Sequence, residues 1–217
     1  MFVSAAVLLA FAALAPYVAP RASGYADAAP AGFSGGFDEP SCHACHFDAE
    51  LNSGPGRVTI AGVPDRFAPG GRYPLTITLT RPDMKLGGFQ LTSRFKDGGA
   101  QAGSLAPDAD ERERVRIDVR SGVQYANQRR TGTSLASAST AGWKLIWTAP
   151  PRGAPVVFHV AGNAANGDDT AERDYVHTAA VESAPDAQRL TPRGRPSARQ
   201  SHASLRVRRP WFMPDPR

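Results

Sequence analysis

Cysteine is scarce in this chain, with two among 217 residues, which excludes a framework of several disulfides. A long hydrophobic run is also missing, because the apolar N-terminal stretch Ala5–Ala15 is shorter than a membrane-spanning helix. No segment keeps a helical period, and 21 Gly and 19 Pro argue against an all-helical protein. The nucleophile-elbow and phosphate-binding glycine motifs are absent, so nothing in the sequence indicates a hydrolase or a nucleotide site.

Residues 1–28 have the pattern of a secretory signal peptide. Pro16 closes the apolar run and small residues follow it, so cleavage is expected between residues 24 and 28. The first residues carry no Lys or Arg, which leaves an uncleaved N-terminal anchor as the alternative. We expect an exported protein, located in the periplasm, outside the cell or at the cell surface.

Positive charge is concentrated at the C-terminal end. Residues 183–217 carry eight Arg against Asp186 and Asp215, a net charge of +6, which leaves −1 for residues 1–182. The near-neutral remainder speaks against nucleic-acid binding. This basic, Pro- and Arg-rich tail is expected to be disordered, either simply solvated or in contact with anionic lipid or an acidic partner.

Eight short runs of alternating or β-branched residues, separated by Gly, Pro, Asn and Asp, are typical of strands. They predict one all-β domain over residues 57–182, an antiparallel β-sandwich with irregular N- and C-terminal extensions. Their alternation places Leu75, Ile77 and Leu79 inward, and likewise Val119 with Val115 and Ile117. The expected strands are Arg57–Gly62, Tyr73–Thr80, Gly88–Phe95, Val115–Arg120, Val123–Asn127, Gly142–Ala149, Pro155–Gly162 and Asp174–Val181.

Both cysteines lie in the loop-like segment 29–56, as Cys42-His-Ala-Cys45-His46. Covalent attachment of haem c needs two thiols at this spacing and an adjacent histidine as proximal iron ligand. Cys42 and Cys45 are therefore the expected thioether anchors and His46 the expected iron ligand. Alternatives remain open: a Cys42–Cys45 disulfide, a thiol-redox pair, or another metal, although four ligands within five residues suit zinc poorly.

A sixth iron ligand, where one exists, is sought by strand direction. The start of the first strand and the loop after the second lie at the same end of an antiparallel pair. That loop carries Met84, the first candidate, and His177 is the second. His159 is expected near the opposite end. The Asn- and Asp-rich stretch 162–169 is interpreted as a turn in preference to a cation-binding loop.

The order of motifs resembles the bacterial Reeler-like family, also called choice-of-anchor V domain proteins. It is carried by CHACH, then GFQLTSRF from Gly88, GWKLIWTAP from Gly142 and AGNAANG from Ala161, and it extends over about residues 42–178. The resemblance implies an exported immunoglobulin-like sandwich, often preceded by Cys-x-x-Cys-His, with no established enzymatic activity. The C-terminus departs from the family, because no apolar anchor follows the domain.

Two functions follow as expectations. The first is a haem-binding protein that carries electrons or presents haem to a redox or surface protein partner. The second is a non-enzymatic interaction or adhesion module in which Cys42 and Cys45 form a structural disulfide.

Overall fold

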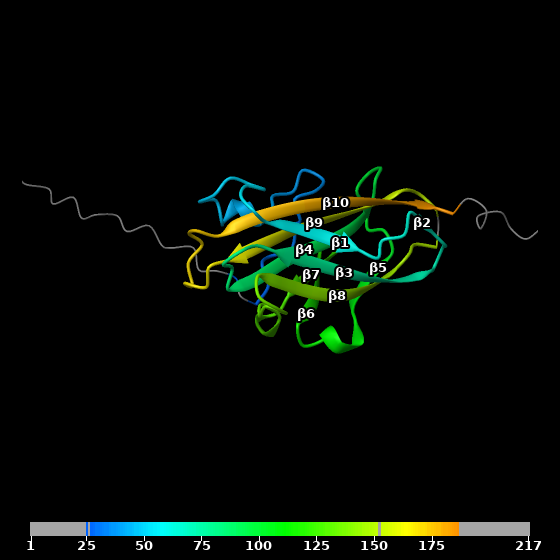
Figure 1. Ribbon diagram of the computed structural model, residues 1–217. Helices are drawn as coiled ribbons and strands as arrows, with labels where there is room; N and C mark the ends of the chain where they lie inside the picture. The colour runs from blue at the N-terminus through cyan, green and yellow to red at the C-terminus, as the bar shows by residue number, and fades with distance from the viewer. Residues whose placement is uncertain (1–24, 26, 152, 187–217) are drawn as a thin grey trace, which may run out of the picture.

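The computed structural model describes Tyr25 and residues 27–151 and 153–186 as a sandwich of two sheets (Figure 1). One sheet has the strand order β1-β3-β8-β5 and the other β2-β10-β9-β4-β7-β6. In these residues the helical turns are three short 3-10 helices, η1 Cys42–Ala44, η2 Ala109–Glu111 and η3 Arg130–Gly132. The strands are β1 Arg57–Ala61, β2 Arg66–Phe67, β3 Arg72–Thr80, β4 Leu86–Phe95, β5 Ser104–Pro107, β6 Val115–Arg120, β7 Val123–Gln128, β8 Thr140–Thr148, β9 Val156–Ala165 and β10 Tyr175–Pro185.

The core lies between the sheets and is built by period-2 alternation. The expected inward residues of β3 are buried, and Trp143 and Trp147 of β8 are buried beside them. From the opposite sheet, Phe89 packs on Trp143 with ring centroids 4.5 Å apart, and Phe158 packs on Trp147 at 4.9 Å. Stacked aromatic and branched side chains therefore hold the two sheets face to face.

All eight expected strands are present, and two further ones, β2 and β5, were not expected. Both are short: β2 has two residues and β5 has four, the last of them Pro107, so neither shows a period. The strands pair antiparallel with one exception, because β2 pairs parallel with the end of β10. The expectation of a purely antiparallel sandwich is corrected at this edge.

Two local expectations also differ. Val119 was expected to face the core, but its side chain is 65% exposed because it lies near the end of the edge strand β6. Strand β10 continues to Pro185, so the sheet extends three residues beyond the expected boundary at residue 182. The expected signal peptide lies outside the described residues except for Tyr25, Asp27 and Ala28, and the basic tail lies outside them from residue 187 onward.

The segment before β1 covers the outer face of the six-stranded sheet. Gln90 of β4 points away from the core, since its neighbours Phe89 and Leu91 point into it, yet it is fully buried. Its carbonyl oxygen accepts from the backbone N–H groups of Gly32 and Phe33, and its amide donates to the oxygens of Pro30 and Asn127. One glutamine thus ties the N-terminal segment to the sheet.

A second set of contacts holds the same segment further along. Glu39 accepts hydrogen bonds from Arg94 of β4 and Tyr125 of β7. Asn52 bonds with Thr178 of β10 through both its amide oxygen and its amide nitrogen. Sheet residues therefore hold the segment on both sides of the Cys-x-x-Cys-His motif without any disulfide.

We predict that Gln90→Leu lowers the free energy of unfolding by about 2–4 kcal/mol, because it leaves the buried donors of Gly32 and Phe33 unpaired. Urea unfolding measures the loss, and hydrogen exchange of these two amides should accelerate. Gln101→Leu is the matched control: its side chain bonds Gln124 and Gly103 instead, so it should destabilise without exposing the segment. Unchanged amide protection in the Gln90 variant would contradict the assignment.

Candidate functional site

The Cys-x-x-Cys-His motif forms a compact turn. Ser41 caps η1 by accepting from the backbone N–H of His43, and the N–H groups of Cys45 and His46 both donate to the carbonyl of Cys42. His43 turns aside, with Nε2 2.9 Å from the carbonyl oxygen of Ala49. The two cysteine sulfurs are not bonded to each other. The turn leaves both thiols and the His46 ring available on one side.

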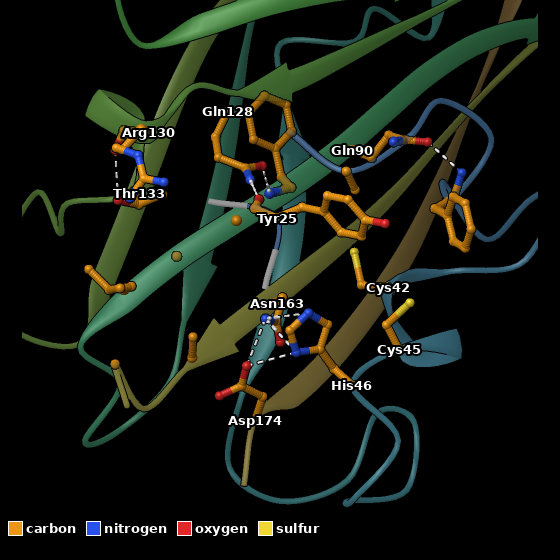
Figure 2. Close-up of a pocket in the computed structure, with 18 of the residues that line it drawn as sticks. Tyr25, Cys42, Cys45, His46, Gln90, Gln128, Arg130, Thr133, Asn163 and Asp174 are labelled. Carbon is orange, nitrogen blue, oxygen red and sulfur yellow. Dashed lines mark hydrogen bonds and ion pairs between the residues drawn. The ribbon is translucent and has the colours of Figure 1, made fainter. Parts of the chain in front are cut away.

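These three side chains line a pocket of about 310 Å³ at one end of the six-stranded sheet (Figure 2). Its opposite wall is the start of β4, from Leu86 to Gln90, with Ala165 of β9 beside it. Tyr25, Pro30 and Phe33 of the N-terminal segment add further apolar surface. The volume is at the lower end of the range for small-molecule and cofactor sites.

Glycine keeps this wall flat. Gly88 faces the pocket side of the sheet, because a Cβ there would approach the side-chain amide of Gln128, itself a lining residue, to 3.3 Å. The neighbouring Gly87 faces the core, where a Cβ would lie 2.5 Å from Ala141. The absence of a side chain at Gly88 lets the amide of Gln128 lie against the strand, and Gln128 lines the pocket there.

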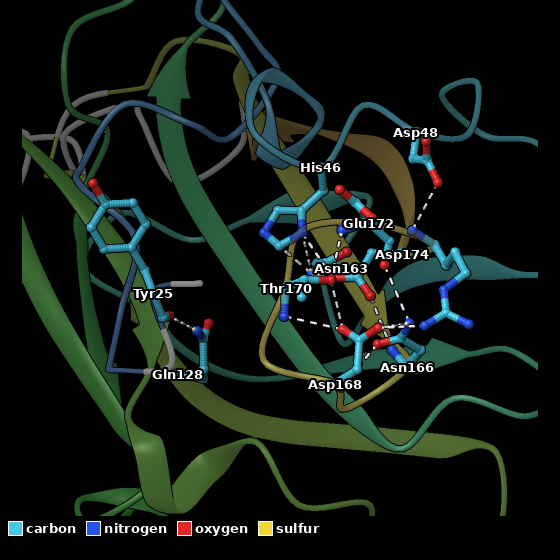
Figure 3. Close-up of polar contacts among 11 residues, drawn as sticks. Tyr25, His46, Asp48, Gln128, Asn163, Asn166, Asp168, Thr170, Glu172 and Asp174 are labelled. Atoms are coloured by element: carbon cyan, nitrogen blue, oxygen red, sulfur yellow. Dashed lines mark hydrogen bonds and ion pairs between the residues drawn. The ribbon is translucent and has the colours of Figure 1, made fainter. Parts of the chain in front are cut away.

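His46 is held by a buried carboxylate (Figure 3). Its Nδ1 lies 2.8 Å from Oδ2 of Asp174, which is 1% exposed. The same oxygen accepts from Nδ2 of Asn163 at 3.0 Å, and Oδ1 accepts from the backbone N–H of Asn166 at 3.0 Å. Both oxygens of Asp174 act as acceptors, which is the behaviour of an ionised carboxylate.

This arrangement favours a proton on Nδ1 of the His46 ring. An ionised carboxylate has no proton to donate, so the short contact requires an N–H at Nδ1. The Nε2 atom has one long contact, 3.5 Å from Nδ2 of Asn163. The Oδ1 atom of Asn163 is buried without a hydrogen-bond partner. With the proton on Nδ1, the lone pair of His46 lies on Nε2.

The loop before β10 is organised by its own side chains. Asp168 accepts from the hydroxyl and backbone N–H of Thr170 and pairs with Arg173 at 2.6 Å. Hydrogen bonds from Thr170 hold the pKa of Asp168 well below its ordinary value. The backbone N–H of Arg173 donates to Asp48, which joins this loop to the one after the motif (Figure 3). The turn interpretation of the Asn- and Asp-rich stretch 162–169 is therefore confirmed for residues 166–169, but it is wrong for residues 162–165, which form the end of β9.

The cysteines differ from an activated redox pair. Burial raises the pKa of the Cys42 thiol to about 12, so it is protonated at neutral pH. Among the described residues, no three His, Cys, Asp or Glu side chains gather closely enough to hold a bare metal ion.

The candidates for a sixth iron ligand lie elsewhere. Met84 is buried in the hydrophobic core, and it does not line the pocket. His177 is only 2% exposed, with an unpartnered Nε2 beneath Gly56, and it does not line the pocket either. His159 packs edge-on against Phe37. The structure brings together the three motif residues and leaves these candidates apart from them.

Sequence reasoning missed the pocket residues outside the motif, above all Asp174, Asn163 and Gly88. Asn163 belongs to the stretch 162–169 that was interpreted as a turn, and Asp174 and Gly88 each begin an expected strand. Their polarity and small size were visible, but each has an ordinary structural explanation at its position.

In the described part of the chain no helix is long and apolar enough to cross a membrane. No family model matches the chain, and no curated protein does. Among solved structures, the chain is similar to the reeler domain of human F-spondin, at 15% identity over 64% of this chain and 95% of that one, with a TM-score of 0.42.

The Reelin-N domain of F-spondin matches at 15% identity over 66% of this chain and 96% of that one, with a TM-score of 0.43. A cohesin module of a Clostridium perfringens family 33 glycoside hydrolase matches at 13% identity, over 60% of this chain and 96% of that one, with a TM-score of 0.43. At TM-scores below 0.5, membership of the bacterial Reeler-like family stays a prediction.

Proposed function

We propose that the chain binds haem c covalently and acts in electron transfer or in presenting haem to a redox or surface protein partner. Cys42 and Cys45 would provide the thioether bonds, and His46 would be the proximal iron ligand. Bound haem would supply a reversible one-electron change at iron. Export to the periplasm or the cell exterior is part of the proposal, because c-type attachment takes place outside the cytosol.

One observation carries the proposal: the three motif side chains line a single pocket, together with the start of β4. Apolar contacts with Leu86 and Phe33 suit a hydrophobic macrocycle. The residues present therefore fit the group.

The sixth position remains open. Among the described residues that line the pocket, His46 is the sole histidine and there is no methionine. Ligation by Met84 or His177 would require either side chain to leave a buried position. Tyr25, Gln90 and Gln128 line the pocket with polar atoms that could hydrogen-bond a small exogenous ligand.

The second candidate is a non-enzymatic interaction module. Phe47 and Leu51 follow the motif, and Phe47 is 71% exposed, which suits contact with a protein partner. In this alternative Cys42 and Cys45 form a disulfide. In the loop-entropy model, closing so short a loop would stabilise the folded state by only about 2 kcal/mol, because it restricts the unfolded chain little. The segment is already held by side-chain contacts on either side of the motif, so a staple there would add little.

A thiol-redox enzyme is the least favoured use of the motif. Such enzymes depend on a cysteine whose pKa is lowered, and burial moves the pKa of Cys42 in the opposite direction. Contact of the basic tail with anionic lipid concerns residues that lie outside the described part of the chain.

The haem proposal predicts that protein exported from a host with c-type maturation machinery gains the mass of one haem. After chemical reduction, its visible spectrum should show the α-band of haem c. Cys42→Ser with Cys45→Ser should abolish both, because no thioether can form, while the circular dichroism of the sandwich is retained. His43→Ala is the matched control, since His43 bonds Ala49 and does not line the pocket. It should keep the haem.

A colourless wild-type protein whose mass is two hydrogen atoms below that of the fully reduced chain would contradict haem binding. It would support the interaction module with a Cys42–Cys45 disulfide. In that case the double serine variant should bind the same partners with an unchanged fold.

Slow reaction of Cys42 with iodoacetamide is the next expectation. In haem-free, reduced Cys45→Ser protein, alkylation at pH 8 should be roughly 50-fold slower than for the same variant unfolded in urea, because a pKa of about 12 lowers the thiolate fraction more than it raises nucleophilicity. Mass spectrometry gives both rates. Equal rates would show an accessible, ionisable thiol and would revive the redox alternative.

A further inference from the structure

The histidine of the motif is oriented by a residue more than a hundred positions away in the sequence. We propose that Asp174 is the positioning residue of His46: it holds the ring in its Nδ1–H tautomer and so leaves Nε2 as the metal-binding atom. The choice of haem iron as that metal rests on the proposed function. The positioning itself rests on contacts within the protein.

The support for His46 is built into the sandwich and not into the motif segment. Asp174 directly precedes β10, and Asn163 lies in β9 opposite Val176 of β10. Asp174 is buried and accepts from Asn163 and Asn166, so its carboxylate is oriented by neighbours on its own side of the contact. The motif segment brings His46 to an acceptor that the sheet already provides.

The two carboxylate oxygens of Asp174 accept hydrogen bonds from different donors. Oδ1 is taken by the backbone N–H of Asn166, and Oδ2 is shared by Asn163 Nδ2 and His46 Nδ1. Asn163 Nδ2 also lies 3.2 Å from His46 Nδ1; in the proposed tautomer both atoms carry hydrogens, so this contact is not a hydrogen bond there. The amide nitrogen of Asn163 therefore donates to Asp174, and Asp174 accepts from the His46 ring.

Metal-binding histidines typically donate their second ring N–H to a carboxylate, a carbonyl or water, which sets the tautomer and raises the basicity of the ligating nitrogen. A buried carboxylate is the strongest of these acceptors, since a hydrogen bond to a charged group exceeds one to a neutral group. Asp174 should therefore make His46 an electron-rich ligand, which favours the more highly charged state of the metal it binds.

A structural ion pair would tie down the loop before β10 without controlling the ring. The two roles differ in what Asp174→Asn changes. Asparagine keeps the size of the side chain and an acceptor oxygen, but it removes the charge. The matched control is Asp169→Asn, which removes a charge from the same loop and the same pocket wall, at a residue that contacts neither His46 nor Asn163.

The first test uses haem-free, full-length protein carrying ¹⁵N-labelled histidine, at alkaline pH where the imidazole is neutral. In the wild type, NMR should show His46 with its proton on Nδ1. In Asp174→Asn the ratio of Nδ1–H to Nε2–H should fall by about fivefold, because the neutral amide oxygen is a weaker acceptor than the carboxylate. Asp169→Asn should match the wild type.

Two results would overturn the positioning role. One is a wild-type His46 with its proton mainly on Nε2, and this requires no variant to fold. The other is an Asp174→Asn protein that is folded, by near-UV circular dichroism, and keeps the wild-type tautomer ratio.

The second test uses protein matured with haem. Resonance Raman of the reduced protein should place the iron–imidazole stretch at lower frequency in Asp174→Asn than in the wild type, with the haem still attached by mass. An unchanged stretch would contradict the inference. A wild type without haem would refute the proposed function, and the tautomer measurement on the same protein would still decide the role of Asp174.

Discussion

The attachment of the N-terminal segment to the outer face of the six-stranded sheet is the interaction on which the candidate site depends. A polar side chain on an outer sheet face normally reaches water, but Gln90 is buried because the segment lies over it. Buried polar groups are costly unless every one is paired, so this contact defines the position of the segment closely. Without it the cysteines would have no wall opposite them and no pocket.

The pocket is thus an interface within one chain. One side is the N-terminal segment before β1, which is rich in Gly and Pro and is held in place by contacts with the sheet. The other is regular strand, formed by the start of β4 and the end of β9. This division suits a covalently held cofactor, because the thiols and the ligating histidine lie on one short turn while the sandwich supplies the wall. It also explains how a β-protein could hold haem without the helices that enclose it in small cytochromes.

The strands were largely predictable from particular residues. Alternation in Tyr73–Thr80 gave the correct inward face, and the register of Arg57 with Thr80 agrees with the expected strand direction. Prediction failed where alternation no longer controls burial. Val119 alternates correctly but lies on an edge strand with nothing packed over it, and β2 is too short to show a period. Met84 illustrates the same limit: strand direction located its loop, but the side chain turns into the core.

The sequence by itself determined the motif, its spacing, the all-β class and the concentration of positive charge in the tail, since each depends on residues close together in the chain. The tertiary structure alone decided that Asp174 and Asn163 meet His46 and that the start of β4 lines the same pocket as the cysteines. Those contacts depend on the pairing of β4, β9 and β10 and on the path of the segment across them. Pairings between distant strands are set by the packing of the whole domain, and no local pattern of residues encodes them.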